Sequence, residues 1–126
     1  MCIRDSATAL VTVLTTGTIG DTYLIGGDAE RTNLAVVETI CDLVDERLGV
    51  GPAGPRRRLI EFVADRPGHD HRYAVDATKV RDELDWRPTV SFEDGLARTV
   101  DWYLSNEAWW RPIQDGTYAG DRLGLT

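Results

Sequence analysis

A run of charged residues around a Pro-Gly turn is the segment of this sequence best suited to bind an anion. A guanidinium group is planar and can contact two phosphate oxygens, and Pro67 stiffens the backbone beside Arg66. His69 can donate to a phosphate or a hydroxyl, and Gly68 lets a ligand approach the backbone. A solvated loop, with Arg66 ion-paired to a neighbouring aspartate, is the alternative. The run consists of Asp65, Arg66, Pro67, Gly68, His69 and Asp70.

A second candidate anion contact, Asn33, lies at the start of a helix expected over residues 32–48. Apolar residues recur there every three or four positions, which is typical of an amphipathic helix, and Gly49 follows as a stop. Thr32 or Asn33 is expected to begin this helix. Free N–H groups and the positive end of the helix dipole favour an anion at this point. Asparagine is also a common capping residue, so capping alone would explain Asn33.

Two further groups of residues suggest binding roles that we do not favour. Three consecutive arginines at positions 56–58 are basic enough for phosphate, but in a Gly/Pro-rich loop such a run is more often a solvated face. Large aromatic side chains can stack on a base, yet they are more often core or interface anchors. No Tyr-x-x-x-Lys pair occurs, and we assign no segment to dinucleotide binding. The tryptophans are Trp86, Trp102, Trp109 and Trp110.

The elements that would position these residues alternate between helices and short strands. We expect a helix from Ala7 to near Gly17, strands at residues 22–25 and 59–63, a short helix from Asp76 through Leu84 and a last helix after Ser91. The second strand would hold the charged loop in place. Two strands alone are marginal in water, so we expect them to complete a sheet whose other strands lie outside this sequence. The aromatic tail, expected to pack onto another surface, contains Trp109, Trp110, Ile113 and Tyr118.

The order of expected helices and strands indicates an α/β fold, and the composition is that of a soluble globular protein with neither a membrane span nor the charge of a general nucleic-acid binder. The chain has 126 residues and a net charge of −7, from 14 basic and 21 acidic residues, which argues against general binding to nucleic acid. No apolar run approaches the roughly 20 residues that a membrane span needs. With only Cys2 and Cys41 present, a reducing cytoplasm is the expected location. Residues 1–6 do not join the periodic pattern, and we interpret them as a non-native scar before a domain at residues 7–126.

Several segments taken together closely resemble the C-terminal third of the dTDP-glucose 4,6-dehydratases, a family of the extended short-chain dehydrogenase/reductase group. The Asp-Arg-Pro-Gly-His-Asp turn with Arg-Tyr-Ala is the most specific part of the likeness. Two departures are Leu24, where the family often has Asn, and Asp85, where a glycine normally caps the helix and where we expect some loss of stability. The segments are residues 22–27, 31–34, 63–69, 72–76, 79, 84–88 and 99–104.

The resemblance implies an incomplete substrate-binding domain of a Rossmann-type fold, with a few short strands and about four helices. It implies that an N-terminal Rossmann domain outside this sequence binds NAD and carries every catalytic residue, so this chain alone would be inactive. The full protein would be a cytoplasmic lyase and homodimer that removes water from dTDP-glucose, giving dTDP-4-dehydro-6-deoxyglucose in rhamnose-type biosynthesis. The implied substrate-binding residues are Asn33, Asp65, Arg66, Pro67, Gly68 and His69, with Arg66 near the pyrophosphate.

Two alternatives remain open from the sequence. One is another nucleotide-sugar epimerase, dehydratase or decarboxylase of the same group. The other is a non-catalytic module that uses the loop only to bind a nucleotide sugar. A glycine-rich loop and a Tyr-x-x-x-Lys pair upstream would favour an enzyme over a module.

Overall fold

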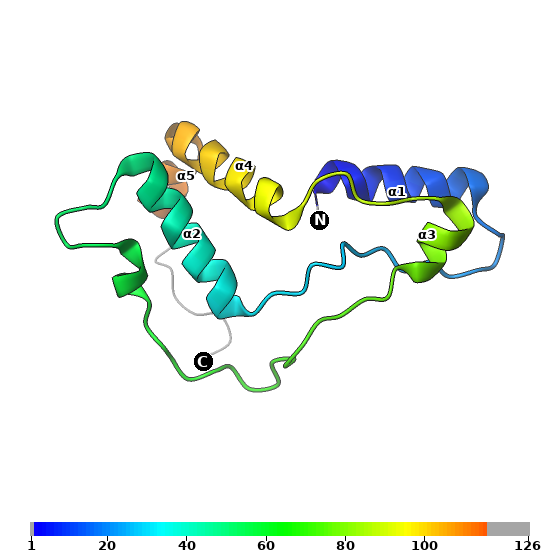
Figure 1. Cartoon of the computed structure of the whole chain (residues 1–126), viewed down its shortest axis with the longest axis horizontal. Coiled ribbons are helices and arrows are strands. Elements are labelled where there is room, and N and C mark those ends of the chain that lie inside the picture. Colours follow the sequence, from blue (N-terminus) through cyan, green and yellow to red (C-terminus); the bar gives the residue numbers. More distant parts are fainter. Residues whose placement is uncertain (1, 116–126) are drawn as a thin grey trace. The chain divides into compact units, whose positions relative to one another are not determined.

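The computed structural model describes residues 2–115 and is helical throughout its regular parts (Figure 1). Contacts divide the chain into two units: Met1–Arg31 with Arg72–Leu96, and Thr32–His71 with Ala97–Thr126. The helices, in chain order, are α1 (Ile3–Thr16), α2 (Asn33–Leu48), the 3-10 helix η1 (Arg56–Leu59), α3 (Thr78–Leu84), α4 (Phe92–Ser105) and α5 (Glu107–Gln114).

The prediction of strands at residues 22–25 and 59–63 is wrong for the described part of the chain. Residues 22–25 and 60–63 belong to no strand, and Leu59 ends the 3-10 helix η1. Within residues 2–115 the one β-type pairing is an isolated bridge between Gly51 and Gly54. A strand is defined by hydrogen bonds to a partner strand, and residues 2–115 supply none to either segment.

The first unit is built on a small buried cluster between α1 and α3. Ala9 and Val80 are fully buried, and Trp86 is 6% exposed. The indole Nε1 of Trp86 donates to the Thr8 hydroxyl at 3.3 Å, so the ring's polar atom is satisfied as well as its apolar surface. Ala77 completes the cluster, and the partly buried residues around it are Val13, Tyr23, Ile25 and Leu84.

Helix α1 begins at Ile3, four residues before the predicted start, and it includes a buried carboxylate. Asp5 is 2% exposed. Its oxygens accept hydrogen bonds from the Thr89 hydroxyl at 2.7 Å and from the backbone N–H groups of Thr89 and Val90, each at 3.2 Å. The hydrogen bond from the Thr89 hydroxyl is the main reason why the pKa of Asp5 lies below its ordinary value, against the opposing effect of burial. The non-native origin of residues 1–6 stays a prediction.

The short helix α3 has polar residues at both ends. Asp76 was predicted as its N-cap, but Ala77 holds that position and Asp76 Oδ1 accepts from the Thr78 N–H at 2.9 Å from one residue earlier. The pKa of Asp76 is lowered, chiefly by its hydrogen bond from the Thr78 side chain. Asp85 ends the helix in the left-handed conformation, with φ 50° and ψ 28°, as expected from its place in the motif.

In the second unit, α2 and η1 are joined by ion pairs. Thr32 caps α2 by accepting from the Ala35 N–H at 3.1 Å, and Gly49 follows the helix with φ 76°. Arg56 pairs with Asp45, and Arg57 donates from Nε to Asp42 at 2.6 Å. Two of the three consecutive arginines are therefore bound to the acidic side of α2, which corrects the prediction of a solvated face.

Residues Glu107–Gln114 of the aromatic tail form helix α5, whereas the sequence analysis assigned the tail no secondary structure. Helix α5 carries Trp109, whose ring meets Trp102 of α4 edge-on with centroids 5.2 Å apart. Trp110 Nε1 donates to the Tyr103 carbonyl at 2.8 Å. Ser91 caps α4 as predicted, by accepting from the Asp94 N–H at 3.0 Å. The predicted tail residue Tyr118 lies outside the described residues.

Candidate functional site

The predicted binding loop is an exposed turn in the irregular segment between η1 and α3. Pro67 and Gly68 form the turn, and Gly68 has φ 69°. Nothing lies within 4 Å of the position that a Cβ at Gly68 would take. The glycine is therefore required by the left-handed backbone and not by lack of space.

Asp65 organises this loop through one oxygen. Its Oδ1 accepts the backbone N–H of Arg66 at 2.7 Å and lies 2.8 Å from Nδ1 of His69. The His69 side chain is 28% exposed and that of Asp65 is 69% exposed. The predicted site residues on either side of the turn are therefore joined by hydrogen bonds.

Arg66 is exposed, and its guanidinium forms no ion pair with the residues that the structure describes. The alternative of a surface ion pair with Asp65 or Asp70 is not found there. Asp65 contacts Arg66 through the backbone N–H instead. The guanidinium therefore has its donors available for an anion.

Asn33 is the first residue of α2 and is exposed. Thr32 performs the capping, so the capping alternative does not apply to the Asn33 side chain. Asn33 and the loop residues 65–69 all belong to the second unit.

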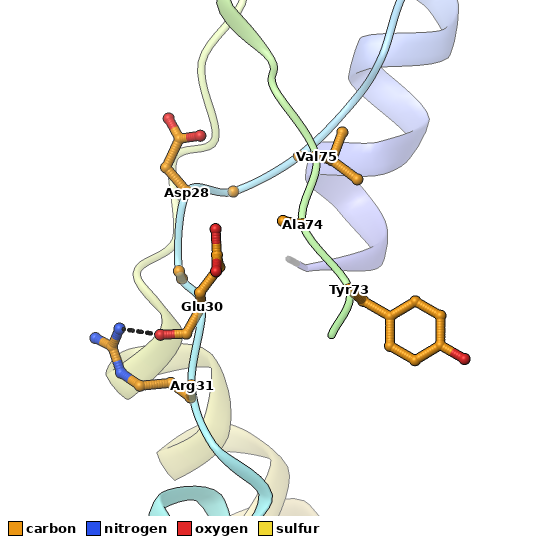
Figure 2. Close-up of a pocket in the computed structure, with 9 residues that line it drawn as sticks. Asp28, Glu30, Arg31, Tyr73, Ala74 and Val75 are labelled. Carbon is orange, nitrogen blue, oxygen red and sulfur yellow. Dashed lines mark hydrogen bonds between the residues drawn. The ribbon is translucent and has the colours of Figure 1, made fainter. Parts of the chain in front are cut away.

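A separate pocket of about 410 Å³ lies in the first unit, between two extended segments. Figure 2 shows residues 73–75 passing beside the segment that contains Asp28 and Arg31, with the Tyr73 ring directed away from that segment. A Cβ on Gly26 would lie 3.3 Å from the Val75 Cβ, so this glycine permits the close approach that the Gly-Gly pair suggested. None of the predicted site residues lines this pocket. Its lining residues are Gly26, Gly27, Asp28, Ala29, Glu30, Arg31, Tyr73, Ala74 and Val75.

Ion pairs hold one wall of this pocket, the segment of residues 28–31. Asp28, at φ 48°, pairs with Arg81 of α3. Glu30 pairs with Arg72 at 2.7 Å, and Arg31 pairs with Glu93 of α4 at 2.7 Å. These pairs link residues far apart in sequence, so neither spacing nor local charge could have revealed them. The local signal available was the Gly-Gly pair itself.

The glycine-rich segment of residues 49–54 does not form a dinucleotide loop. The spacing G-x-G-x-x-G does occur at Gly49, Gly51 and Gly54, which the sequence interpretation overlooked. This hexapeptide follows a helix and precedes a 3-10 helix, whereas a dinucleotide loop joins a strand to a helix. The Gly54 N–H donates to the Gly51 carbonyl at 2.9 Å, and a Cβ at Gly54 would meet Arg58 at 3.0 Å. The turn is closed on itself and does not fit a pyrophosphate.

The described part of the chain offers neither a metal site nor a membrane-spanning helix. Residues 2–115 contain no cluster of His, Cys, Asp and Glu able to hold a metal ion. None of the helices there combines the length and apolar character that crossing a bilayer requires. The charged turn and the pocket are thus two candidate sites in the part of the chain that the structure describes.

Comparison with known proteins decides the family. The model of the family described as GDP-mannose 4,6 dehydratase matches residues 1–99. The chain belongs to this family. Within it, the chain is 50% identical over 125 residues to the dTDP-glucose 4,6-dehydratase of Escherichia coli, covering 98% of this chain and 34% of that protein. It is 52% identical over 124 residues to the dTDP-glucose 4,6-dehydratase of Neisseria meningitidis serogroup B, covering 97% and 35%. The chain spans about a third of the length of the curated relatives it matches.

Solved structures of dTDP-glucose 4,6-dehydratases resemble this chain in both fold and sequence. The dTDP-glucose 4,6-dehydratase of Bacillus anthracis in complex with NAD is 44% identical and superposes with a TM-score of 0.71, covering 87% of this chain and 32% of that one. The enzyme of Streptomyces venezuelae with NAD and TYD bound is 41% identical, with a TM-score of 0.69 and coverage of 87% and 31%. The resemblance derived from the sequence motifs is confirmed, and so is the relation to Rossmann-type short-chain dehydrogenase/reductase folds.

Proposed function

We propose that this chain is the substrate-binding portion of a dTDP-glucose 4,6-dehydratase. In the complete protein it would take part in converting dTDP-glucose to dTDP-4-dehydro-6-deoxyglucose with loss of water, in rhamnose-type biosynthesis. The observation that carries this proposal is identity of 50% across 98% of the chain with a curated enzyme of that activity. The chain alone is expected to be inactive.

The contribution of this chain is to bind and orient the nucleotide sugar. The residues proposed to line the substrate site are Asn33, Asp65, Arg66, Pro67, Gly68 and His69. Arg66 is proposed to lie next to the pyrophosphate. Its unpaired guanidinium in the described structure supports that role, because a bidentate contact to phosphate needs free donors. Holding the substrate in one orientation lowers the entropic part of the barrier.

The remaining two-thirds of the complete protein are proposed to bind NAD and to contain the catalytic residues. The closed turn between Gly51 and Gly54 gives no place for the dinucleotide in the described residues. A homodimer in the cytoplasm is the proposed setting of the complete enzyme.

The family description supports one competitor, an enzyme acting on GDP-mannose. A chimaera in which this chain replaces the last third of the Escherichia coli relative tests between the two. We expect it to release water from dTDP-glucose and to leave GDP-mannose unchanged. Activity with GDP-mannose alone would refute the proposed substrate. Tight binding of dTDP-glucose without turnover in a folded chimaera would favour a non-catalytic module.

Replacing Arg66 in the same chimaera tests the binding site. Arg66→Ala is expected to weaken dTDP-glucose binding about 10- to 100-fold, since a charge-assisted hydrogen bond contributes about 1.5–3 kcal/mol. NAD affinity should be retained. Calorimetric titration of both ligands checks this, with the exposed α4 residue Arg98 changed to Ala as the control. Unchanged affinity for the nucleotide sugar would remove Arg66 from the site.

A further inference from the structure

We propose that Asp65 is a positioning residue of the diphosphate site, which shapes the loop through Arg66 and His69 and does not itself touch the diphosphate. This role rests on the proposed function. It changes Asp65 from a proposed substrate contact to a residue that positions other contacts. It separates Asp65 from Arg66 and His69, which the sequence interpretation had grouped together as substrate contacts.

The geometry centres on a single acceptor atom. Asp65 Oδ1 receives the Arg66 backbone N–H at 2.7 Å and approaches His69 Nδ1 to 2.8 Å. These two bonds join the residues on both sides of the Pro67-Gly68 turn. Gly68 has φ 69°, which is one of several conformations open to glycine, so the two hydrogen bonds help to select this turn among them.

Electrostatics argue against direct contact between Asp65 and the diphosphate of the ligand. A diphosphate is anionic, and a carboxylate within hydrogen-bonding distance of it would place like charges together. Ionised carboxylates only accept hydrogen bonds, as phosphate oxygens do, so the two groups cannot bond to each other. Asp65 can therefore assist an anion only by holding the donors.

The same contact fixes the tautomer of His69. Because the Asp65 oxygen can only accept, the proton of the His69–Asp65 bond lies on Nδ1. Nε2 is then the nitrogen left for the ligand: it accepts from a hydroxyl when the ring is neutral and donates to a phosphate in the imidazolium. Asp65 thereby determines which edge of the ring serves the site.

Asp65 is too exposed for its contacts to contribute much to folding. Its side chain is 69% exposed and that of His69 is 28% exposed, and exposed pairs of this kind contribute little to stability. Removing the carboxylate should therefore act on ligand binding more than on unfolding.

Titration with thymidine diphosphate, the nucleotide part of the proposed substrate, tests the role by the sign of the change. Asp65→Ala in the full chain is expected to raise the dissociation constant about tenfold, because the donors lose their common acceptor. Simple removal of a nearby negative charge would instead tighten binding of an anion. Glu61→Ala, which removes a carboxylate just before the loop, measures that charge effect alone. Tighter or unchanged binding in Asp65→Ala would overturn the proposal.

Asp65→Asn separates geometry from charge, since its amide oxygen can occupy the position of Oδ1. We expect its affinity to stay within about threefold of the unchanged chain. Nitrogen-15 chemical shifts of the neutral imidazoles give a second readout, with His71 as the reference ring. His69 should carry its proton on Nδ1 in the unchanged chain and in Asp65→Asn, and lose that preference in Asp65→Ala. A proton mainly on Nε2 in the unchanged chain would contradict the positioning role.

Failure of the proposed function and failure of the positioning role of Asp65 give different results. If neither the unchanged chain nor the chimaera binds thymidine diphosphate, the proposed function is wrong, while the His69 spectrum still decides whether Asp65 orients the ring. If the unchanged chain binds and Asp65→Ala binds equally well, the proposed function stands and the positioning role is wrong.

Discussion

Two aspartates, one in each unit, show how differently a carboxylate can be used. Asp5 is buried, and its hydrogen-bond donors lie more than 80 residues away in sequence, at Thr89 and Val90. Asp65 is exposed, and its partners are one and four residues away. The first holds distant segments of its unit together, whereas the second gives a local turn its shape. A carboxylate of the first kind supports folding, and one of the second kind can support binding.

The largest expected effect tests the buried region to which Asp5 belongs. Trp86→Ala should lower the free energy of unfolding by about 3–5 kcal/mol, because it removes a large side chain from the cluster around Val80. Denaturant unfolding followed by circular dichroism measures this. Trp109→Ala, at a site that is 60% exposed, is the matched control and should change the stability far less. Equal losses would mean that the cluster does not hold the unit together.

The pH dependence of stability tests Asp5 directly. The pKa of Asp5 is lowered in the fold, mainly by the Thr89 hydroxyl, so its contribution is complete above its ordinary value of 3.8 and is lost as the pH falls through the lower folded value. Asp5→Asn should reduce stability at neutral pH and flatten the decline in acid. The asparagine side chain has one acceptor oxygen for the three donors of Thr89 and Val90. Its NH2 group would face a backbone N–H, and two donors cannot form a hydrogen bond. Asp82→Asn, on the exposed side of α3, is the control and should leave the acid profile unchanged.

A glycine of the charged loop tests whether this region depends on local conformation. Gly68→Ala should cost about 1 kcal/mol, because φ 69° is strained for any residue with a Cβ. Gly51→Ala is the comparison, since Gly51 has no positive φ and nothing lies within 4 Å of its added Cβ. Thermal unfolding of both variants gives the difference. No difference between them would show that the turn rearranges freely.

The smallest expected effect is a gain in stability at the end of α3. Asp85→Gly should stabilise the chain by about 0.5 kcal/mol, because glycine adopts the left-handed conformation found there without steric cost. Asp82→Gly, in the interior of the same helix, should cost about 0.3 kcal/mol, the difference in helix propensity between glycine and aspartate. Opposite signs in the two midpoints of thermal unfolding are the expected result. A loss in both variants would show that the Asp85 side chain has a role of its own.

The sequence predicted the local features well and the distant ones poorly. The cap of α2, the Pro-Gly turn and the left-handed Asp85 depend on neighbouring residues, and each was anticipated. The start of α1 was missed because the burial of Asp5 depends on residues 89 and 90. The strands were wrong because a strand needs a partner that an apolar pattern cannot guarantee.

The candidate sites also differ in whether neighbouring residues or residues distant in sequence determine them. Charge and turn chemistry pointed to Arg66 and His69 from the sequence, although not to the single oxygen that links their segment. The pocket beside Val75 could not be foreseen, since its wall is held by pairs such as Glu30 with Arg72. Contacts between segments distant in sequence leave no local signature.

The pairing of η1 with α2 has a consequence for handling the protein. Residues 38–58 contain four acidic residues and four arginines. Arg56 pairs with Asp45 and Arg57 with Asp42, so the charges of this stretch neutralise one another. Arg57 lowers the pKa of Asp42 through its hydrogen bond, so the neutralisation persists in moderately acidic buffer. In strong acid the carboxylates become protonated and the arginines are released. The same stretch then carries a net positive charge and binds phosphate, nucleic acid or a cation-exchange resin.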